Sequence, residues 1–232
     1  MNRSVVETDA LLVLGLETSH APGAVALLAG ERCIERWLPE QQSTTASLLV
    51  AAQELLSQWE RSPQDVGLLC ISRGPGSFTG LRIAMTVAKI WGYVRHVPVV
   101  AVPTPVILAA QIPAVLDELW VLLDAQRREL FAQRFKKREG CWQPAGPCQI
   151  MSAAQWWERL ENRCQVVGTG WRRAEGRGGV KESLVDVGAA SAWRPAASTL
   201  CRVGWHLYQE GQVADPWTLV PDYVRPSGAE ER

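Results

Sequence analysis

The chain has 232 residues, 47% hydrophobic and 21% charged, a balance that is typical of a folded globular protein and excludes a disordered one. Its 24 basic and 24 acidic side chains cancel, so the bulk charge gives no support for strong binding of nucleic acid by the chain alone. No apolar stretch approaches the roughly 20 residues that span a bilayer, and the first ten residues do not resemble a signal peptide, which indicates a cytoplasmic protein without membrane contact.

The first half of the chain begins with three apolar runs. These runs, at residues 11–18, 24–29 and 33–38, are separated by short polar breaks and predict an antiparallel meander. Apolar residues at helical spacing then alternate with further apolar runs. The predicted elements are a helix at 43–59 with Ser43 as its N-cap, a strand at 66–72, a helix at 80–93, a strand at 98–102 and a helix from about 104 to 111.

The second half repeats this order more weakly. Its predicted elements are strands at 119–123 and 129–135, a helix at 152–161 capped by Ser152, a strand at 165–167, a mobile glycine-rich loop at 172–181 and a helix at 196–208. This order predicts an α/β fold of two ribonuclease-H-like lobes, each from a β-β-β-α-β-α unit. We expect lobes at 1–112 and 113–232, with the last helix able to pack back on the first lobe.

A polar turn follows the first strand at Glu17, Thr18 and Ser19. Short side chains there let backbone N–H groups approach an anion, and a carboxylate can hold a cation or water. A nucleotide site is therefore one interpretation of this turn. The plainer one, an ordinary polar hairpin, is preferred on the turn alone.

The strongest motif is the glycine-rich loop between the strand at 66–72 and the helix at 80–93. It contains Gly74, Pro75, Gly76, Ser77, Phe78, Thr79, Gly80 and Arg82. A P-loop would need Lys and then Ser or Thr after Gly80, and a dinucleotide fingerprint would need glycine in place of Thr79. Because both phosphate-binding patterns fail, we interpret the loop as structural, with Pro75 stiffening it, the glycines allowing tight turns and Thr79 capping the helix.

This loop carries a family resemblance. The run Gly-Pro-Gly-Ser-Phe-Thr-Gly-Leu-Arg-Ile at 74–83 resembles the signature of the TsaB family, which has the actin-like ATPase fold. Weaker similarities keep their order along the chain: the turn at 17–19, the stretch at 123–131, the turn at 167–171, the segment at 221–225, and Ala229 with Glu230. The chain departs from the family pattern at Glu17, Gln126 and Phe131, and throughout 139–195.

The resemblance implies a non-catalytic subunit of the complex that transfers a threonylcarbamoyl group to the adenosine beside the anticodon of tRNA. Such a chain would bind and stabilise a TsaD-like catalytic subunit, and a TsaE-like small ATPase would join the pair. We expect contact with tRNA only through this complex, and a homodimer when the chain is alone. No cofactor and no metal is expected, while weak nucleotide binding is left open at Glu17, Thr18, Ser19 and Asp124.

The positions of the histidines distinguish the expected non-catalytic subunit from a metalloenzyme. The related TsaD catalytic subunits carry two histidines one helical turn apart, which can share a metal ion. Here His20, His96 and His206 stand alone, and the helix at 43–59 has none. A metalloprotease is therefore disfavoured.

An actin-like ATPase or sugar kinase with weak nucleotide binding is the alternative function. Asp124 lies where such an enzyme places its second acid, at the end of the strand that opens the second lobe. However, Gln126 and Arg127 replace the small residues that a phosphate would need nearby.

A basic cluster lies in the same part of the chain, at Arg127, Arg128, Arg134, Lys136, Lys137 and Arg138. Its preferred interpretation is a solvated strand and turn.

The helices at 43–59 and 80–93 look too apolar for helices with one buried face. In the first, we expect Leu48, Leu49, Ala52, Leu55 and Leu56 to face the sheet. The apolar residues left over on the two helices predict an interface with a partner or a second copy: Ala46, Val50, Ala51, Ile83, Met85 and Ile90. The plainer alternative is that these residues pack against the second lobe. The resemblance implies the same two helices, in a four-helix contact.

Overall fold

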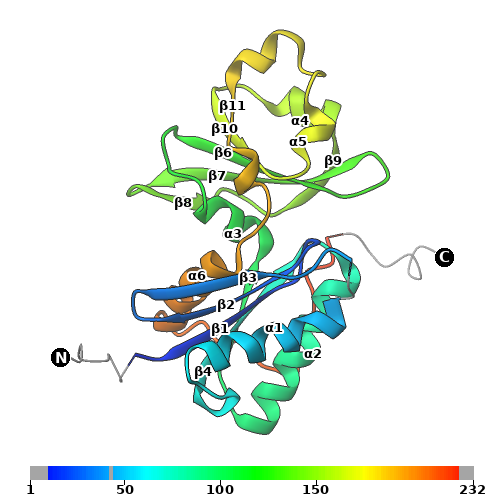
Figure 1. The fold of residues 1–232 in the computed structure, drawn as a ribbon. Helices are drawn as coiled ribbons and strands as arrows, with labels where there is room; N and C mark the ends of the chain where they lie inside the picture. The colour runs from blue at the N-terminus through cyan, green and yellow to red at the C-terminus, as the bar shows by residue number, and fades with distance from the viewer. Residues whose placement is uncertain (1–9, 42–43, 225–232) are drawn as a thin grey trace. The chain divides into compact units, whose positions relative to one another are not determined.

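The computed structural model describes residues 10–41 and 44–224 of the chain (Figure 1). They form two compact units, one of residues 10–41, 44–73, 77–102 and 196–220 and the other of residues 74–76, 103–195 and 221–224. The boundary at residue 102 precedes the expected boundary at 112, because the helix that begins at Thr104 packs against strands of the second unit.

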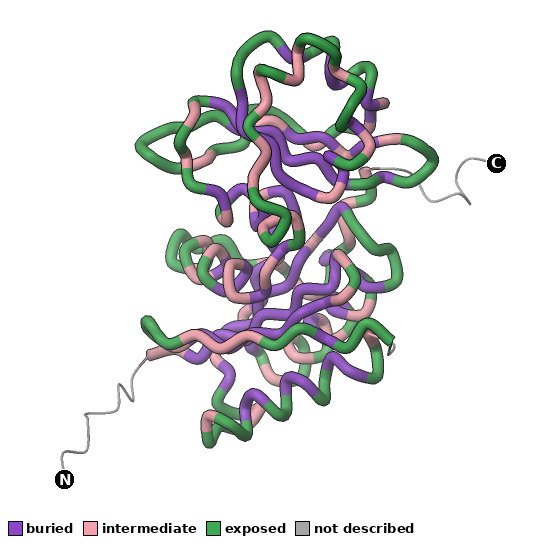
Figure 2. Tube along the Cα trace, turned by 45° about the horizontal axis from the view of Figure 1, so that its top comes forward, coloured by how far each residue is buried: buried purple, intermediate pink, exposed green. Residues whose placement is uncertain are grey.

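Five strands form the sheet of the first unit, in the order β3-β2-β1-β4-β5. Their bounds are β1 Leu12–Glu17, β2 Ala24–Ala29, β3 Arg32–Trp37, β4 Val66–Gly74 and β5 Val99–Pro103. The first three form the predicted antiparallel meander, while β4 runs parallel to β1. Strands β1, β2 and β4 are apolar and buried along almost their whole length (Figure 2), so the sheet needs cover on both faces.

Three helices provide this cover: α1 Thr44–Gln58, α2 Phe78–Arg95 and α6 Ala197–Gln209. Helices α1 and α2 share one core cluster with Leu14 and Leu16 of β1. The opposite face of β1 meets α6, where a Cβ built at Gly15 would lie 2.5 Å from Sγ of Cys201. A short 3-10 turn, Pro63–Asp65, leads from α1 into β4.

The second unit contains a sheet in the order β11-β10-β6-β7-β8, with β9 paired to β7 as well. The bounds are β6 Glu118–Asp124, β7 Glu129–Arg138, β8 Cys141–Pro144, β9 Gln149–Ser152, β10 Cys164–Val167 and β11 Val185–Val187. Strands β6, β7 and β8 are antiparallel, and β10 runs parallel to β6 and to β11. If β9, which pairs only with β7, is left out of the count, each sheet has its third, second, first, fourth and fifth strand side by side. This order confirms the duplicated ribonuclease-H-like plan of the actin-like fold.

Each face of the second sheet has its own core. On one face, α3 (Thr104–Ala110) contributes Leu108 to a cluster with Val121 and Phe135. On the other, α4 (Ala153–Arg159) and α5 (Trp171–Ala174) supply most of a buried tryptophan cluster. Its members are Trp120, Trp156, Trp157 and Trp171, with neighbouring ring centroids 4.6–6.3 Å apart. Four of the chain's 11 tryptophans therefore belong to this core.

The differences from the prediction lie mainly in the second unit. Strands β8, β9 and β11 were not expected, and part of the loop expected at 172–181 is ordered as α5 and a 3-10 helix, Gly179–Leu184. Ser152 caps α4 as predicted, since its hydroxyl accepts from the N–H of Gln155. The expected cap of α1, Ser43, lies outside the described residues, as do the C-terminal positions Arg225, Ala229 and Glu230.

Candidate functional site

The turn after β1 is buried. Glu17, Thr18 and Ser19 are each only 1% exposed. Oε1 of Glu17 accepts hydrogen bonds from the backbone N–H and the hydroxyl of Ser19, and the hydroxyl of Ser72 accepts from the N–H of Thr18. Apart from Oε2 of Glu17, the polar side-chain atoms of this turn are therefore hydrogen-bonded within the described structure.

The carboxyl group of Glu17 is in an unfavourable place for a charge. Its second oxygen, Oε2, is buried and has no hydrogen-bond partner within the described part of the chain. Burial raises the pKa of Glu17 from 4.5 to about 7, although the hydrogen bonds from Ser19 and the nearby hydroxyl of Ser72 act in the opposite direction. Near neutral pH this side chain is thus only partly ionised, unlike a carboxylate held ready for a metal ion.

The glycine-rich loop continues from β4 into α2. Gly74 has φ 108°, which only glycine adopts without strain, whereas Gly76 is exposed and its φ lies outside the left-handed region. The cap of α2 is Ser77, whose hydroxyl accepts from the N–H of Gly80, so the prediction of Thr79 as the cap was wrong. Thr79 lies inside the helix because α2 begins two residues earlier than expected, at Phe78.

This loop packs directly on the turn after β1. The hydroxyl of Thr18 donates to the carbonyl of Gly80 at 2.8 Å, and the N–H of Ser77 donates to the carbonyl of Ser19 at 2.7 Å. A Cβ at Gly80 would lie 2.0 Å from the carbonyl oxygen of Thr18. The signature motif therefore closes the N-terminus of α2 against the turn, as the structural interpretation of the loop expects.

Asp124 ends β6 in the second unit. Its two carboxylate oxygens accept from Nε and a terminal nitrogen of Arg173 at 2.7 and 2.8 Å, and Oδ1 also accepts from the N–H of Gln126. The next turn has positive φ at Gln126, Arg127 and Arg128. This carboxylate is thus occupied by an arginine that the sequence analysis did not connect with it, because 49 residues separate the two.

Helices α1 and α2 expose apolar side chains. Val50 and Ile90 are 56% and 55% exposed, Ala46 is exposed and Ile83 is half-buried. Ala51 and Met85 instead belong to the core, at 5% and 3% exposure, so they cannot contribute to a surface. Ala51 is inside because the buried stripe of α1 runs through positions 47, 48, 51, 52, 55 and 56.

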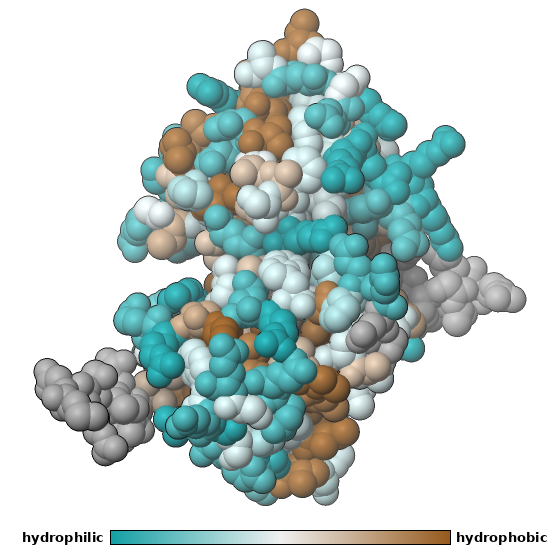
Figure 3. Space-filling model, viewed as in Figure 1, coloured by the Kyte–Doolittle hydropathy of each residue, from teal (hydrophilic) through white to brown (hydrophobic). Residues whose placement is uncertain are grey.

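Leu49 shows the opposite error. We expected it to face the sheet, but it is 51% exposed beside Val50. The outer side of α2 extends the apolar surface through half-buried Val87 to Val94, which is 67% exposed. Figure 3 shows this apolar surface along the outer side of α2. We call the set Ala46, Leu49, Val50, Ile83, Val87, Ile90 and Val94 the α1–α2 face.

The histidines remain apart from one another. His96 ends α2 in the left-handed conformation, and His206 is exposed on α6. His20 accompanies the turn after β1, with Nδ1 3.1 Å from the hydroxyl of Ser19. Within residues 10–41 and 44–224, no three His, Cys, Asp or Glu side chains gather as a metal site would require. None of the described helices is long and apolar enough to cross a membrane.

Comparison with known proteins gives the family. The family model described as TsaD, tRNA N6-adenosine threonylcarbamoyltransferase, matches residues 38–166, more than half of the chain. A Haemophilus influenzae protein named tRNA threonylcarbamoyladenosine biosynthesis protein TsaB is 31% identical over 173 residues, which cover 69% of this chain and 73% of that protein. The chain belongs to the TsaB family.

The family relationship extends over nearly the whole chain. The Bacillus subtilis TsaB is 26% identical over 227 residues, covering 96% of this chain and 97% of its own length. Among solved structures, YeaZ from Pseudomonas aeruginosa superposes with a TM-score of 0.75 at 24% identity, covering 92% of this chain and 99% of that one. The TsaB plan therefore includes the divergent stretch at 139–195.

Proposed function

We propose that the chain is a non-catalytic subunit of the machinery that makes threonylcarbamoyladenosine in tRNA. The support is its membership of the TsaB family, whose curated members are named for this biosynthesis. In this proposal it works in the cytoplasm, binds and stabilises a TsaD-like catalytic subunit, and meets tRNA and a TsaE-like small ATPase within the same complex.

The α1–α2 face is the proposed docking surface, and it is the observation that carries the proposal. Ile83, Val87, Ile90 and Val94 follow the i, i+4, i+7, i+11 spacing of an apolar stripe along one side of α2. Alongside it, α1 exposes Leu49 and Val50. Apolar stripes on two packed helices suit association with a similar helix pair, either from the catalytic partner or from a second copy of this chain.

The surroundings of Glu17 and Asp124 favour a subunit that has no catalytic activity of its own. Glu17 is buried with a raised pKa, and Asp124 is paired with Arg173. A sugar kinase or ATPase would need these carboxylates free to hold a metal ion and water near phosphates. The same observations therefore weigh against the actin-like ATPase alternative.

Size-exclusion chromatography of the purified chain, alone and mixed with the TsaD homologue of the same organism, tests the proposal. The mixture should elute as a complex, and the chain alone as a dimer. If the two proteins elute separately across the micromolar range, the docking role is wrong.

A further inference from the structure

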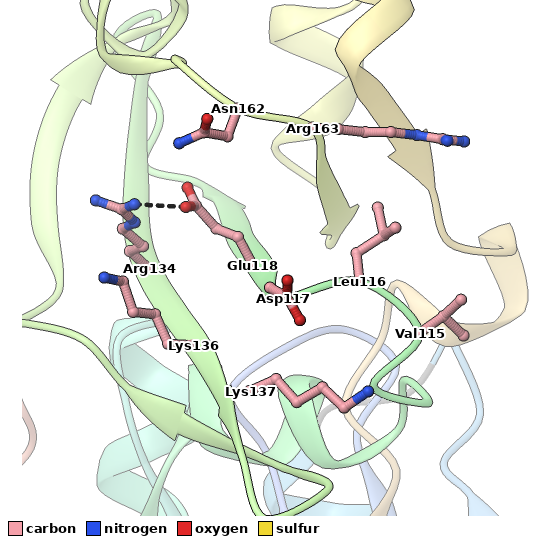
Figure 4. Close-up of a pocket in the computed structure, with 9 residues that line it drawn as sticks. All are labelled: Val115, Leu116, Asp117, Glu118, Arg134, Lys136, Lys137, Asn162 and Arg163. Carbon is pink, nitrogen blue, oxygen red and sulfur yellow. Dashed lines mark hydrogen bonds and ion pairs between the residues drawn. The ribbon is translucent and has the colours of Figure 1, made fainter.

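A charged groove lies at one end of the second sheet, away from the turn at Asp124. Because β6 and β10 run parallel and β7 runs antiparallel to β6, this end gathers the starts of β6 and β10 and the end of β7. The groove measures about 580 Å³ (Figure 4). Its lining residues are Val115, Leu116, Asp117, Glu118, Arg134, Lys136, Lys137, Asn162 and Arg163.

Cations predominate in this lining. Four side chains are basic and two are acidic, and one of each is joined in the ion pair between Arg134 and Glu118. Glu118 is further occupied by the indole N–H of Trp120 at 2.8 Å. Among the described residues, Lys136, Lys137 and Arg163 have no ion-pair partner. All three are exposed, so a ligand can reach their positive charges.

The backbone fixes the two lysines at the groove. Lys136 lies directly opposite Glu118 in the β6–β7 register, and the N–H of Lys137 donates to the carbonyl of Asp117 at 3.0 Å. Figure 4 shows Lys136 to the left of Asp117 and Lys137 below it, with Asn162 above Arg134 and Glu118. Because neighbouring residues of a strand point to opposite faces, the two lysine side chains leave β7 in different directions, and the groove carries positive charge on both sides of this edge of the sheet.

We propose that this groove binds the phosphodiester backbone of RNA. The choice of RNA rests on the function proposed above, which brings the chain to a tRNA. Lysine, arginine and asparagine side chains are the common donors to phosphate and sugar oxygens. None of the nine lining residues is aromatic, so the groove has no aromatic platform on which the base of a mononucleotide would stack. The contact is therefore independent of base sequence.

The test measures binding of a fluorescent, unmodified tRNA transcript to the full chain by anisotropy at several salt concentrations. We expect a dissociation constant of about 1–100 µM, which is the range of sequence-independent contacts. The double variant Lys136→Glu with Lys137→Glu should bind on the order of 10-fold more weakly, and its log–log salt slope should fall by about 2. Asp117→Asn should bind about 2- to 5-fold more tightly, a gain that misfolding cannot produce.

The matched control is Arg61→Glu with Arg177→Glu, two exposed arginines outside the groove. It changes the net charge equally and should leave the affinity within about twofold. Equal losses in both double variants would overturn the proposal, as would unchanged binding in the lysine variant. A second experiment uses calorimetry to titrate the chain with inorganic phosphate and with ATP. The proposal is also overturned if these small anions bind in a way that depends on the two lysines while the tRNA does not bind. Because RNA binding is measured without the catalytic partner, its failure is distinguishable from a failure of docking.

Discussion

Oε1 of Glu17 accepts two hydrogen bonds from Ser19, one from the backbone N–H at 2.7 Å and one from the hydroxyl at 2.5 Å. The other oxygen of the same carboxyl group is buried without a partner in the described structure. A single proton on Oε2 would relieve the buried charge and leave both bonds from Ser19 intact. This arrangement explains why burial can raise the pKa of Glu17 to about 7 against the effect of its hydrogen bonds.

The raised pKa predicts that the contribution of Glu17 to stability falls with increasing pH. The folded state keeps a proton that the unfolded state releases near pH 4.5, so the contribution is complete below 4.5 and is lost as the pH rises to about 7. The loss is on the order of 3 kcal/mol. Urea unfolding at pH 5 and pH 8 should show Glu17→Gln stabilised relative to wild type mainly at pH 8. Glu31→Gln, at an exposed turn, is the control; an equal effect of Glu17→Gln at both pH values would exclude the mechanism.

A single methyl group added at Gly80 should strongly destabilise the fold. Its Cβ would come 2.0 Å from the carbonyl oxygen of Thr18, a backbone atom that cannot rotate away. Gly80→Ala should therefore lower the free energy of unfolding by about 1–3 kcal/mol, measured by urea or thermal denaturation. The glycines of this loop were all expected to allow tight turns, but Gly76 is exposed and its φ lies outside the left-handed region, so Gly76→Ala should change stability by less than about 0.5 kcal/mol. Equal destabilisation by both substitutions would refute this distinction.

The fold was predictable where burial imposes a period on the sequence. The apolar runs at β1, β2 and β4 and the stripe of α1 identify their elements, because such patterns are stable only when buried. Strand β8 has no such pattern, since it is a largely exposed edge of four residues. What joins it to the sheet is backbone pairing with β7, which leaves little trace in side-chain type.

The candidate surface was predictable only in part. The stripe through Leu48, Ala52 and Leu55 gives the direction of the core but not which flank of α1 is covered. Leucine was preferred over alanine for the inside, yet Leu49 is exposed and Ala51 is buried. The small Ala51 lies on the flank of α1 that the core covers, while Leu49 would be too far around the helix to reach it. The pair of Asp124 and Arg173 depends wholly on tertiary structure and could not be foreseen.

The purified chain should not turn over ATP. Glu17 is buried and Asp124 is held by Arg173, so neither carboxylate is placed to organise a metal ion and an attacking water. Phosphate release from ATP with magnesium should stay at the level of a no-protein blank. Arg173→Ala, which removes the arginine from Asp124, should not create activity. Robust turnover that Glu17→Gln or Asp124→Asn abolishes would restore the ATPase alternative.

The α1–α2 face gives the most direct prediction about partners. Val50 and Ile90 are each more than half exposed, on α1 and on α2, so a charge at either site meets water in the free chain. Ile83 is less suitable, because it packs partly against the core and a charge there would also disturb folding. The tests of docking therefore belong at Val50 and Ile90.

Val50→Asp and Ile90→Asp should each weaken association with the TsaD homologue by at least about 30-fold, since a carboxylate buried in an apolar interface without a partner costs about 2 kcal/mol or more. The free energy of unfolding should change by less than about 0.5 kcal/mol, because neither side chain is part of the core. Val180→Asp is the matched control: this valine is 91% exposed in the second unit and should leave association unchanged. Size-exclusion chromatography reports complex formation and thermal denaturation reports folding. Normal complex formation by both variants would refute docking at this face, and a large fall in melting temperature would show instead that these side chains support the fold.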